Sequence, residues 1–150
     1  MEKYETQKLI GEGAQGSVYL AIDKRLGRKV AIKSLHKEFI SDETHFRRFE
    51  EEAKILSQLN HNSIVTLYDY CYDKDGFYLV MELVKGKSLD KAIKKDGFFV
   101  QIRAINISIR ILKAIQYIHD KEIIHRDIKP SNIILDENDK IKLLDFGIAN

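Results

Sequence analysis

The sequence is poor in residues that would form disulfide bonds, rigid turns or membrane spans. It has one cysteine and one proline among 150 residues, and tryptophan is absent. The single cysteine, Cys71, excludes a disulfide within the chain and fits a reducing compartment. No apolar run approaches the ~20 residues that a membrane-spanning helix needs. We therefore expect a soluble, cytoplasmic domain without a membrane segment.

Charge of one sign is not in large excess either. Lys and Arg number 25 against 23 Asp and Glu, so the net charge is +2. No run of basic residues concentrates this charge, so the sequence gives no reason to expect a nucleic acid or a membrane surface as partner. The polar residues 1–5 lack the apolar stretch of a secretory signal.

The first half of the chain has the turn residues and apolar patterns of β-strands. Residues 42–59 interrupt this pattern with apolar residues at intervals of three or four, which predicts a helix. We expect Ser41 to be its N-cap, with Asp42 and Glu43 in the first turn. The predicted strands are bounded by glycines or turn-like sequences and cover residues 4–10, 17–22, 29–35, 64–72 and 77–83.

The second half is predicted to be mainly helical. The sequence Lys85-Gly86-Lys87 is expected to be a short flexible joint. Helices are predicted over residues 88–95 and 100–119, followed by two short strands over residues 133–136 and 140–144. The long helix is expected to carry an apolar face made of Ile102, Ile105, Ile109, Leu112 and Ile115.

A glycine-rich loop of the pattern Gly-x-Gly-x-x-Gly occupies residues 11–16. Glycine lets the backbone approach a ligand closely, so backbone N–H groups can face phosphate oxygens. Alone the motif is weak, because glycines also form ordinary tight turns. The following residues, 17–22, are strand-like, whereas a dinucleotide-binding loop opens a helix, and no Walker-type sequence occurs. The loop is therefore predicted to lie in a β-hairpin.

The predicted strand over residues 29–35 contains Val-Ala-Ile-Lys at residues 30–33. Strand alternation places Ala31 and Lys33 on one face, where small Ala31 would leave room for a flat ligand beside the lysine charge. A lysine at a strand end is the plain alternative. Glu52 falls on or beside the apolar face of the predicted helix, where an unpaired carboxylate would be costly. We hypothesise that Lys33 is its partner.

Two further polar motifs follow apolar segments near the end of the chain. The loop His-Arg-Asp-Ile-Lys-Pro-Ser-Asn, residues 125–132, lies between apolar flanks, and Pro130 disfavours helix at Lys129. Loops held by a rigid scaffold often carry chemistry. Asp-Phe-Gly, residues 145–147, follows a predicted strand. An acid at a strand end can point into a cleft and hold a metal ion.

In order and spacing, these motifs resemble those of eukaryotic-type protein kinases. The resemblance implies an α+β fold with an N-terminal antiparallel β-sheet lobe, one helix in that lobe, and the beginning of a mainly helical C-terminal lobe. It implies an N-lobe over residues 1–83, a hinge over 84–87 and an incomplete C-lobe over 88–150.

The resemblance implies transfer of the ATP γ-phosphate to a Ser or Thr hydroxyl of a protein, with Mg²⁺ as cofactor. Asp127 would orient the substrate hydroxyl and accept its proton, and Lys129 would contact the transferred phosphate. Lys33, held by Glu52, would bind the α- and β-phosphates. The lysine at position 129 makes this loop similar to the corresponding loop of serine/threonine kinases rather than that of tyrosine kinases.

The resemblance also implies ligands for the metal and the nucleotide. Asn132 and Asp145 would bind Mg²⁺, which prefers hard oxygen ligands. His125 would pack with apolar residues that couple the lobes, which favours a structural role. The residues implied to contact ATP are Ile10, Gly11, Glu12, Gly13, Ala14, Gln15, Gly16, Ser17, Val18, Ala31, Lys33, Met81, Glu82, Val84 and Ile134.

The family continues beyond the Asp-Phe-Gly motif with an activation loop and further helices that bind the protein substrate. By this resemblance, the 150 residues are expected to be part of a catalytic domain that transfers phosphate poorly or not at all by itself. The apolar face of the long helix is then expected to be exposed.

Two other functions compete with this interpretation. A non-catalytic, kinase-like ATP-binding module has no support from the motifs, because Lys33, Asp127, Asn132 and Asp145 are all present. A small-molecule kinase, such as an antibiotic phosphotransferase, typically has His-Gly-Asp where this chain has His-Arg-Asp, and it lacks the Lys-Pro pair.

Overall fold

The computed structural model describes residues 2–13, 16–40, 42–73 and 76–146. The chain divides into two units. The first contains the residues up to Ser57 together with Thr66–Leu83, and the second contains Gln58–Val65 together with the residues from Val84 onward. The segment 58–65, which the sequence analysis assigned to the N-terminal lobe, thus belongs to the second unit.

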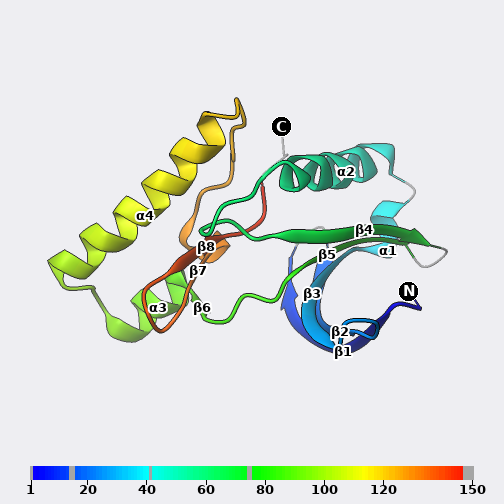
Figure 1. The fold of residues 1–150 in the computed structure, drawn as a ribbon, viewed down its shortest axis with the longest axis horizontal. Coiled ribbons are helices and arrows are strands. Elements are labelled where there is room, and N and C mark those ends of the chain that lie inside the picture. The colour runs from blue at the N-terminus through cyan, green and yellow to red at the C-terminus, as the bar shows by residue number, and fades with distance from the viewer. Residues whose placement is uncertain (1, 14–15, 41, 74–75, 147–150) are drawn as a thin grey trace. The chain divides into compact units, whose positions relative to one another are not determined.

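The first unit is built on a five-stranded antiparallel sheet in the order β1-β2-β3-β5-β4 (Figure 1). This confirms the predicted antiparallel sheet lobe. The strands are β1 (Tyr4–Glu12), β2 (Gly16–Asp23), β3 (Arg28–Leu35), β4 (Leu67–Asp73) and β5 (Gly76–Glu82). Each lies where the sequence pattern predicted a strand, and the ends differ by up to three residues.

The two faces of β3 have different environments, as strand alternation predicts. Val30 and Ile32 are fully buried in one apolar cluster with Ala21, Tyr78 and Val80. Ala31 and Lys33 belong to the other face. Across the sheet, Met81 is paired with Ala31 and Val18 with Lys33, so these side chains share the face of the lysine.

Two helices follow β3 in the first unit, α1 (Lys37–Ile40) and α2 (Glu43–Ser57). The sequence analysis missed α1, because four residues carry too little periodicity. Asp42 caps α2, since its Oδ1 accepts the backbone N–H groups of Thr44 at 2.8 Å and His45 at 3.2 Å. The prediction had placed Asp42 inside the first turn. The predicted cap, Ser41, lies outside the described residues.

The second unit combines helices with a small sheet of order β6-β7-β8. Its helices are α3 (Leu89–Asp96), α4 (Gln101–His119) and the short 3₁₀ helix Pro130–Asn132. Its strands are β6 (Lys87–Ser88), β7 (Ile133–Leu135) and β8 (Ile141–Leu143). Helix α4 packs on β8 and α3 on β7. The predicted joint at residues 85–87 therefore ends in a strand.

The far edge of β8 is bonded to the segment before β4. Leu143 donates its N–H to Ser63 O at 2.8 Å and accepts from Val65 N–H at 3.0 Å. Ser63 and Val65 are therefore hydrogen-bonded to β8 of the second unit, and Ile64 pairs with Leu143. This explains why β4 begins at Leu67, three residues later than the apolar pattern predicted.

Helix α4 packs through positions that the predicted face did not include. Ile107, Ala114 and Ile118 are its buried residues. On the predicted face, Ile102 and Leu112 are 66% and 64% exposed, and Ile105 and Ile109 are also exposed. Four residues of the predicted face are thus exposed as expected, whereas the fifth, Ile115, is half-buried. No helix within the described ranges is long and apolar enough to cross a membrane.

Candidate active site

The glycine-rich loop lies at the turn between β1 and β2, as predicted. Gly11 is paired with Val18 and Glu12 with Ser17, and Gly13 donates its N–H to Gly16 O at 2.9 Å. The tip residues 14 and 15 of the predicted ATP-contacting set lie outside the described residues.

Gly16 brings this hairpin into close contact with β3. A β-carbon at this position would lie 2.3 Å from Ser34 O, a distance that no side chain can adopt. The next residue, Ser17, is buried, and its Oγ lies 3.1 Å from His36 Nε2. His36 sits just after β3, and the sequence offered no signal for this contact. The loop base is therefore fixed by both packing and a side-chain hydrogen bond.

Lys33 and Glu52 form the expected ion pair inside the first unit. Lys33 Nζ lies 2.7 Å from Oε1 and 2.9 Å from Oε2 of Glu52. The side chains are 17% and 8% exposed. Strand β3 supplies the lysine, and α2 supplies the glutamate from its buried face. Because both carboxylate oxygens of Glu52 bond the ammonium, the position of Lys33 is fixed. A cation fixed in this way is suited to binding phosphate oxygens.

The residues predicted to surround the adenine are divided between the two units. Ala31 and Met81 are buried in the first unit, where Ile10 is exposed. Glu82 donates its backbone N–H to Thr66 O at 2.9 Å, so the amide of this predicted adenine-edge residue is already engaged. The others, Val84 and Ile134, are half-buried in the second unit.

In the second unit, Asp127 is the centre of a polar cluster. Its Oδ2 accepts from Lys129 Nζ at 2.8 Å and from Asn132 Nδ2 at 2.7 Å. Asn132 Nδ2 also donates to the backbone oxygen of Asp127 at 3.1 Å. Both of these contacts to the carboxylate are made by Oδ2. Pro130 begins the 3₁₀ turn that carries Asn132 back toward Asp127.

The amide of Asn132 has a defined orientation. Both of its partners on Asp127 are oxygens that only accept hydrogen bonds, so the nitrogen must face them. The amide oxygen, the atom that a cation would bind, therefore points elsewhere. Together with the carboxylate of Asp145 it supplies the hard oxygen donors that Mg²⁺ prefers, so these residues fit a magnesium ion.

His125 is buried, and its hydrogen bonds and ring stacking fix the position of the imidazole. Its Nε2 donates to Leu144 O at 3.1 Å, so Nδ1 is the acceptor for Asp127 N–H at 3.4 Å. Its ring stacks on Phe146 with centroids 4.4 Å apart. Burial lowers the pKa of His125, against smaller opposing effects from the Leu144 hydrogen bond and Asp127. The imidazole is thus held neutral between the loop and the end of β8.

Two residues of these motifs have an unusual backbone conformation. Among the described residues, four non-glycine residues have positive φ, and two of them are Arg126 at 62° and Asp145 at 43°. Such conformations cost energy and persist where the surroundings enforce them, often at functional sites. Leu144 donates its N–H to Asn132 O at 2.8 Å, which joins the residue before the Asp-Phe-Gly motif to the end of the 125–132 loop.

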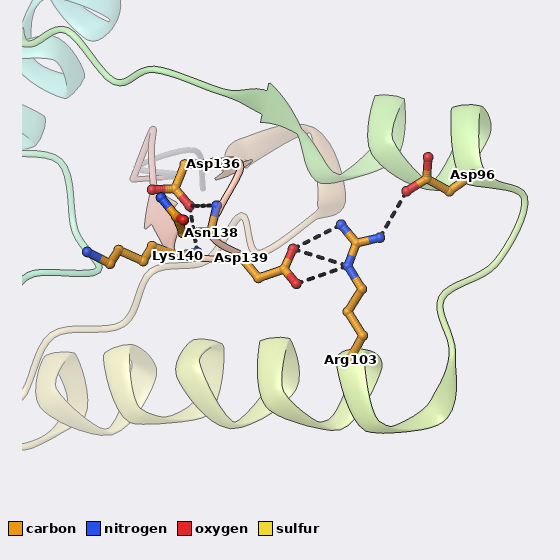
Figure 2. Close-up of polar contacts among 6 residues, drawn as sticks. All are labelled: Asp96, Arg103, Asp136, Asn138, Asp139 and Lys140. Atoms are coloured by element: carbon orange, nitrogen blue, oxygen red, sulfur yellow. Dashed lines mark hydrogen bonds and ion pairs between the residues drawn. The ribbon is translucent and has the colours of Figure 1, made fainter.

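One charged cluster outside these motifs was missed by the sequence analysis. Arg103 in α4 binds Asp96 at the end of α3 and Asp139 in the β7–β8 turn (Figure 2). Arg103 and Asp139 are 36 residues apart, and neither belongs to a motif. Local pattern analysis had no signal by which to find them.

Sequence comparisons agree with this architecture. The chain matches the family model of the protein kinase domain over residues 4–150. It is 43% identical to the serine/threonine-protein kinase PrkC of Bacillus subtilis over 98% of this chain and 23% of that protein. It is 41% identical to a probable serine/threonine-protein kinase, PknB, of Corynebacterium glutamicum over 99% of this chain and 24% of that protein.

A third relative, the serine/threonine-protein kinase PknA of Mycobacterium tuberculosis, is 40% identical over 98% of this chain and 35% of its own length. Protein kinases are phosphoryl-transfer enzymes that generally use ATP and Mg²⁺. The chain belongs to the protein kinase domain family. It spans about a quarter to a third of the length of these curated relatives.

Proposed function

We propose that this chain is the ATP-binding and catalytic-loop part of a serine/threonine protein kinase. The observation that carries the proposal is the Asp127 cluster, in which one carboxylate oxygen is held by Lys129 and Asn132. A general base must be fixed within reach of the proton it takes, and this arrangement fixes Asp127. The names of the relatives, which are serine/threonine kinases, support the choice of substrate class.

In the proposed reaction, the serine or threonine hydroxyl oxygen attacks the γ-phosphorus of ATP. The bond from that phosphorus to the bridging oxygen breaks, ADP leaves, and Asp127 receives the hydroxyl proton. Lys33 binds the α- and β-phosphates, and Lys129 contacts the transferred phosphoryl group. Such catalysis consists mainly of positioning and charge neutralisation, which explains why the residues are fixed cations and oxygen donors.

Asn132 and Asp145 would hold Mg²⁺, which would neutralise the charge of the phosphate oxygens when bound. The glycine-rich hairpin would direct backbone N–H groups at the phosphates. Ile10, Val18, Ala31, Met81 and Ile134 would enclose the adenine, with Glu82 and Val84 at its edge.

The first experiment is a calorimetric titration of the chain with ATP, with and without Mg²⁺, beside an Asp145→Ala variant. We expect magnesium-dependent binding that the variant loses. Equal binding with and without Mg²⁺, or no difference between the two proteins, would contradict the proposed role of Asp145.

A second experiment separates the kinase from a non-catalytic ATP-binding module. Asp127→Asn in the intact protein is expected to keep ATP affinity while phosphate transfer falls by about 10²–10⁴-fold, the usual contribution of a general base. Transfer that does not depend on Asp127 would favour the module. Its control is Asp120→Asn, an exposed carboxylate at the end of α4.

A further inference from the structure

Arg103 joins three elements of the second unit through one planar side chain (Figure 2). Its Nε lies 3.1 Å from both Oδ1 and Oδ2 of Asp139, and its Nη2 lies 2.9 Å from Oδ1. Its Nη1 donates to Asp96 Oδ2 at 2.9 Å. The guanidinium carbon lies 4.2 Å from the ring centroid of Phe99. Fork-shaped pairing of this kind fixes direction as well as distance.

Asp139 uses its side chain for this contact and not for its own turn. The turn is closed by Asp136, whose Oδ1 accepts the N–H groups of Asn138 and Lys140, each at 2.8 Å. The backbone of Asp139 has φ 56°, the left-handed region that glycine adopts more easily. Asp139 thus occupies a position where the backbone favours glycine, and its carboxylate binds Arg103.

The opposite end of this hairpin carries the two proposed magnesium ligands. Strand β7 begins directly after Asn132, and β8 ends two residues before Asp145. The strands have three residues each, too short to hold a defined position by themselves. Strand β6 and the segment 63–65 are hydrogen-bonded to the two edges of the β7–β8 hairpin. The turn of the hairpin is instead bound by Arg103.

We propose that Arg103 is a positioning residue for the metal site. By fixing the β7–β8 turn to α4, it sets the position of the hairpin and hence of Asn132 and Asp145 at its other end. This inference rests on the proposed function, in which these two residues bind Mg²⁺.

If Arg103 only stabilised the fold, the Mg²⁺ requirement would change only as far as stability changes. The variant Asp139→Gly distinguishes this role from a positioning role. This variant removes the acceptor and also relieves the left-handed backbone, so its net effect on stability is small. If Arg103 positions the hairpin, the Mg²⁺ requirement must still rise. Asp96→Asn is the matched control, because it alters the contact to α3 and keeps the fork on Asp139.

Two readouts are measured on the chain and on four variants, Arg103→Leu, Arg103→Lys, Asp139→Gly and Asp96→Asn. The first is hydrogen exchange at the Leu144 amide without ligand, followed by NMR, because this amide bonds Asn132 O at the end of the hairpin. The second is the Mg²⁺ concentration that half-saturates ATP binding. Melting temperature is recorded for each variant.

We expect Arg103→Leu and Asp139→Gly to speed exchange at Leu144 and to raise the Mg²⁺ midpoint by about three- to tenfold. This lies below the roughly 10–100-fold effects of groups that touch metal ligands directly. Arg103→Lys, which keeps the charge but not the fork, should be intermediate. Asp96→Asn should match the parent.

Unchanged exchange and an unchanged midpoint in Asp139→Gly would overturn the positioning role. The positioning role would also be overturned if exchange at Leu144 and the Mg²⁺ midpoint changed across the variants only in proportion to their melting temperatures. If ATP binding by the parent chain does not depend on Mg²⁺, the proposed function fails in this chain. Exchange at Leu144 still decides in that case whether Arg103 holds the far end of the hairpin.

Discussion

At the scale of single residues, the ion pair between Lys33 and Glu52 shows how the fold brings two opposite charges together. Strand alternation turns Lys33 away from the apolar cluster of Val30 and Ile32, and α2 brings Glu52 to it. Removing one partner from a mostly buried pair leaves the other charge uncompensated. The glutamate therefore both stabilises the first unit and holds the lysine in the position proposed for phosphate binding.

Glu52→Gln is expected to lower the free energy of unfolding by about 1–3 kcal/mol. It should also weaken ATP binding by roughly tenfold, which corresponds to ~1.4 kcal/mol. Urea unfolding and calorimetric titration measure the two effects. Glu51→Gln, at an exposed neighbouring position on α2, is the control. Equal ATP affinity in both variants would contradict the role given to Glu52.

His125 gives a pH dependence whose direction follows from its burial. The folded pKa lies below the usual value of 6.5, so the unfolded chain binds a proton more readily. The stabilisation from neutral His125 is complete above pH 6.5 and is lost as the pH falls from there toward the lowered folded pKa.

Thermal unfolding between pH 7.5 and pH 5 checks this expectation. We expect the parent to lose more stability over this range than His125→Gln, which can still donate to Leu144 O but does not titrate. The remaining histidines are the same in both proteins, so the difference isolates His125. Parallel pH profiles would show that His125 does not carry this dependence.

At the scale of elements, Gly86 explains why the joint before α3 is not simply flexible. Its φ is 139°, and an added β-carbon would lie 2.4 Å from Leu135 O in β7. The backbone passes this close because β6 begins at the next residue and pairs with β7. Glycine is thus required here by both conformation and space.

Gly86→Ala is expected to cost about 1–3 kcal/mol from backbone strain, with the clash against Leu135 in addition. Gly97→Ala is the control, because φ is 76° there and nothing lies within 4 Å of the added β-carbon. Chemical denaturation of the second unit should show the larger loss for Gly86→Ala. If Gly97→Ala lost as much stability, the close approach to β7 would be irrelevant.

At the scale of the whole molecule, α4 divides its apolar residues between packing and solvent. Ile118 is fully buried, whereas Leu112 is 64% exposed. Exposed apolar patches of this kind favour association. With a net charge of +2, repulsion between copies of the chain is weak.

Leu112→Gln is therefore expected to change stability by no more than about 0.5 kcal/mol. It should also reduce self-association in sedimentation experiments. Ile118→Ala should instead cost about 2–5 kcal/mol, because it leaves a cavity in the packed side of α4. A large loss of stability in Leu112→Gln would mean that this face is packed in solution.

The sequence by itself determined most of the strands, the three longer helices and the identity of the site motifs. Strand alternation and helical spacing are local properties of the backbone, so the faces of β3 and the position of α2 follow from the order of residues. The same local rule misplaced the start of β4, because the apolar residues 64 and 65 serve a different sheet.

The tertiary structure alone decided which distant groups meet. The motifs named Lys33, Asp127 and Asn132, and helical spacing indicated Glu52 as the partner of Lys33. The two donors on Asp127 Oδ2, in contrast, depend on how the 125–132 loop folds. The pairing of Arg103 with Asp139 crosses 36 residues and two kinds of element. Neither residue follows a local periodicity that could predict its partner, since the chain path between them sets their distance.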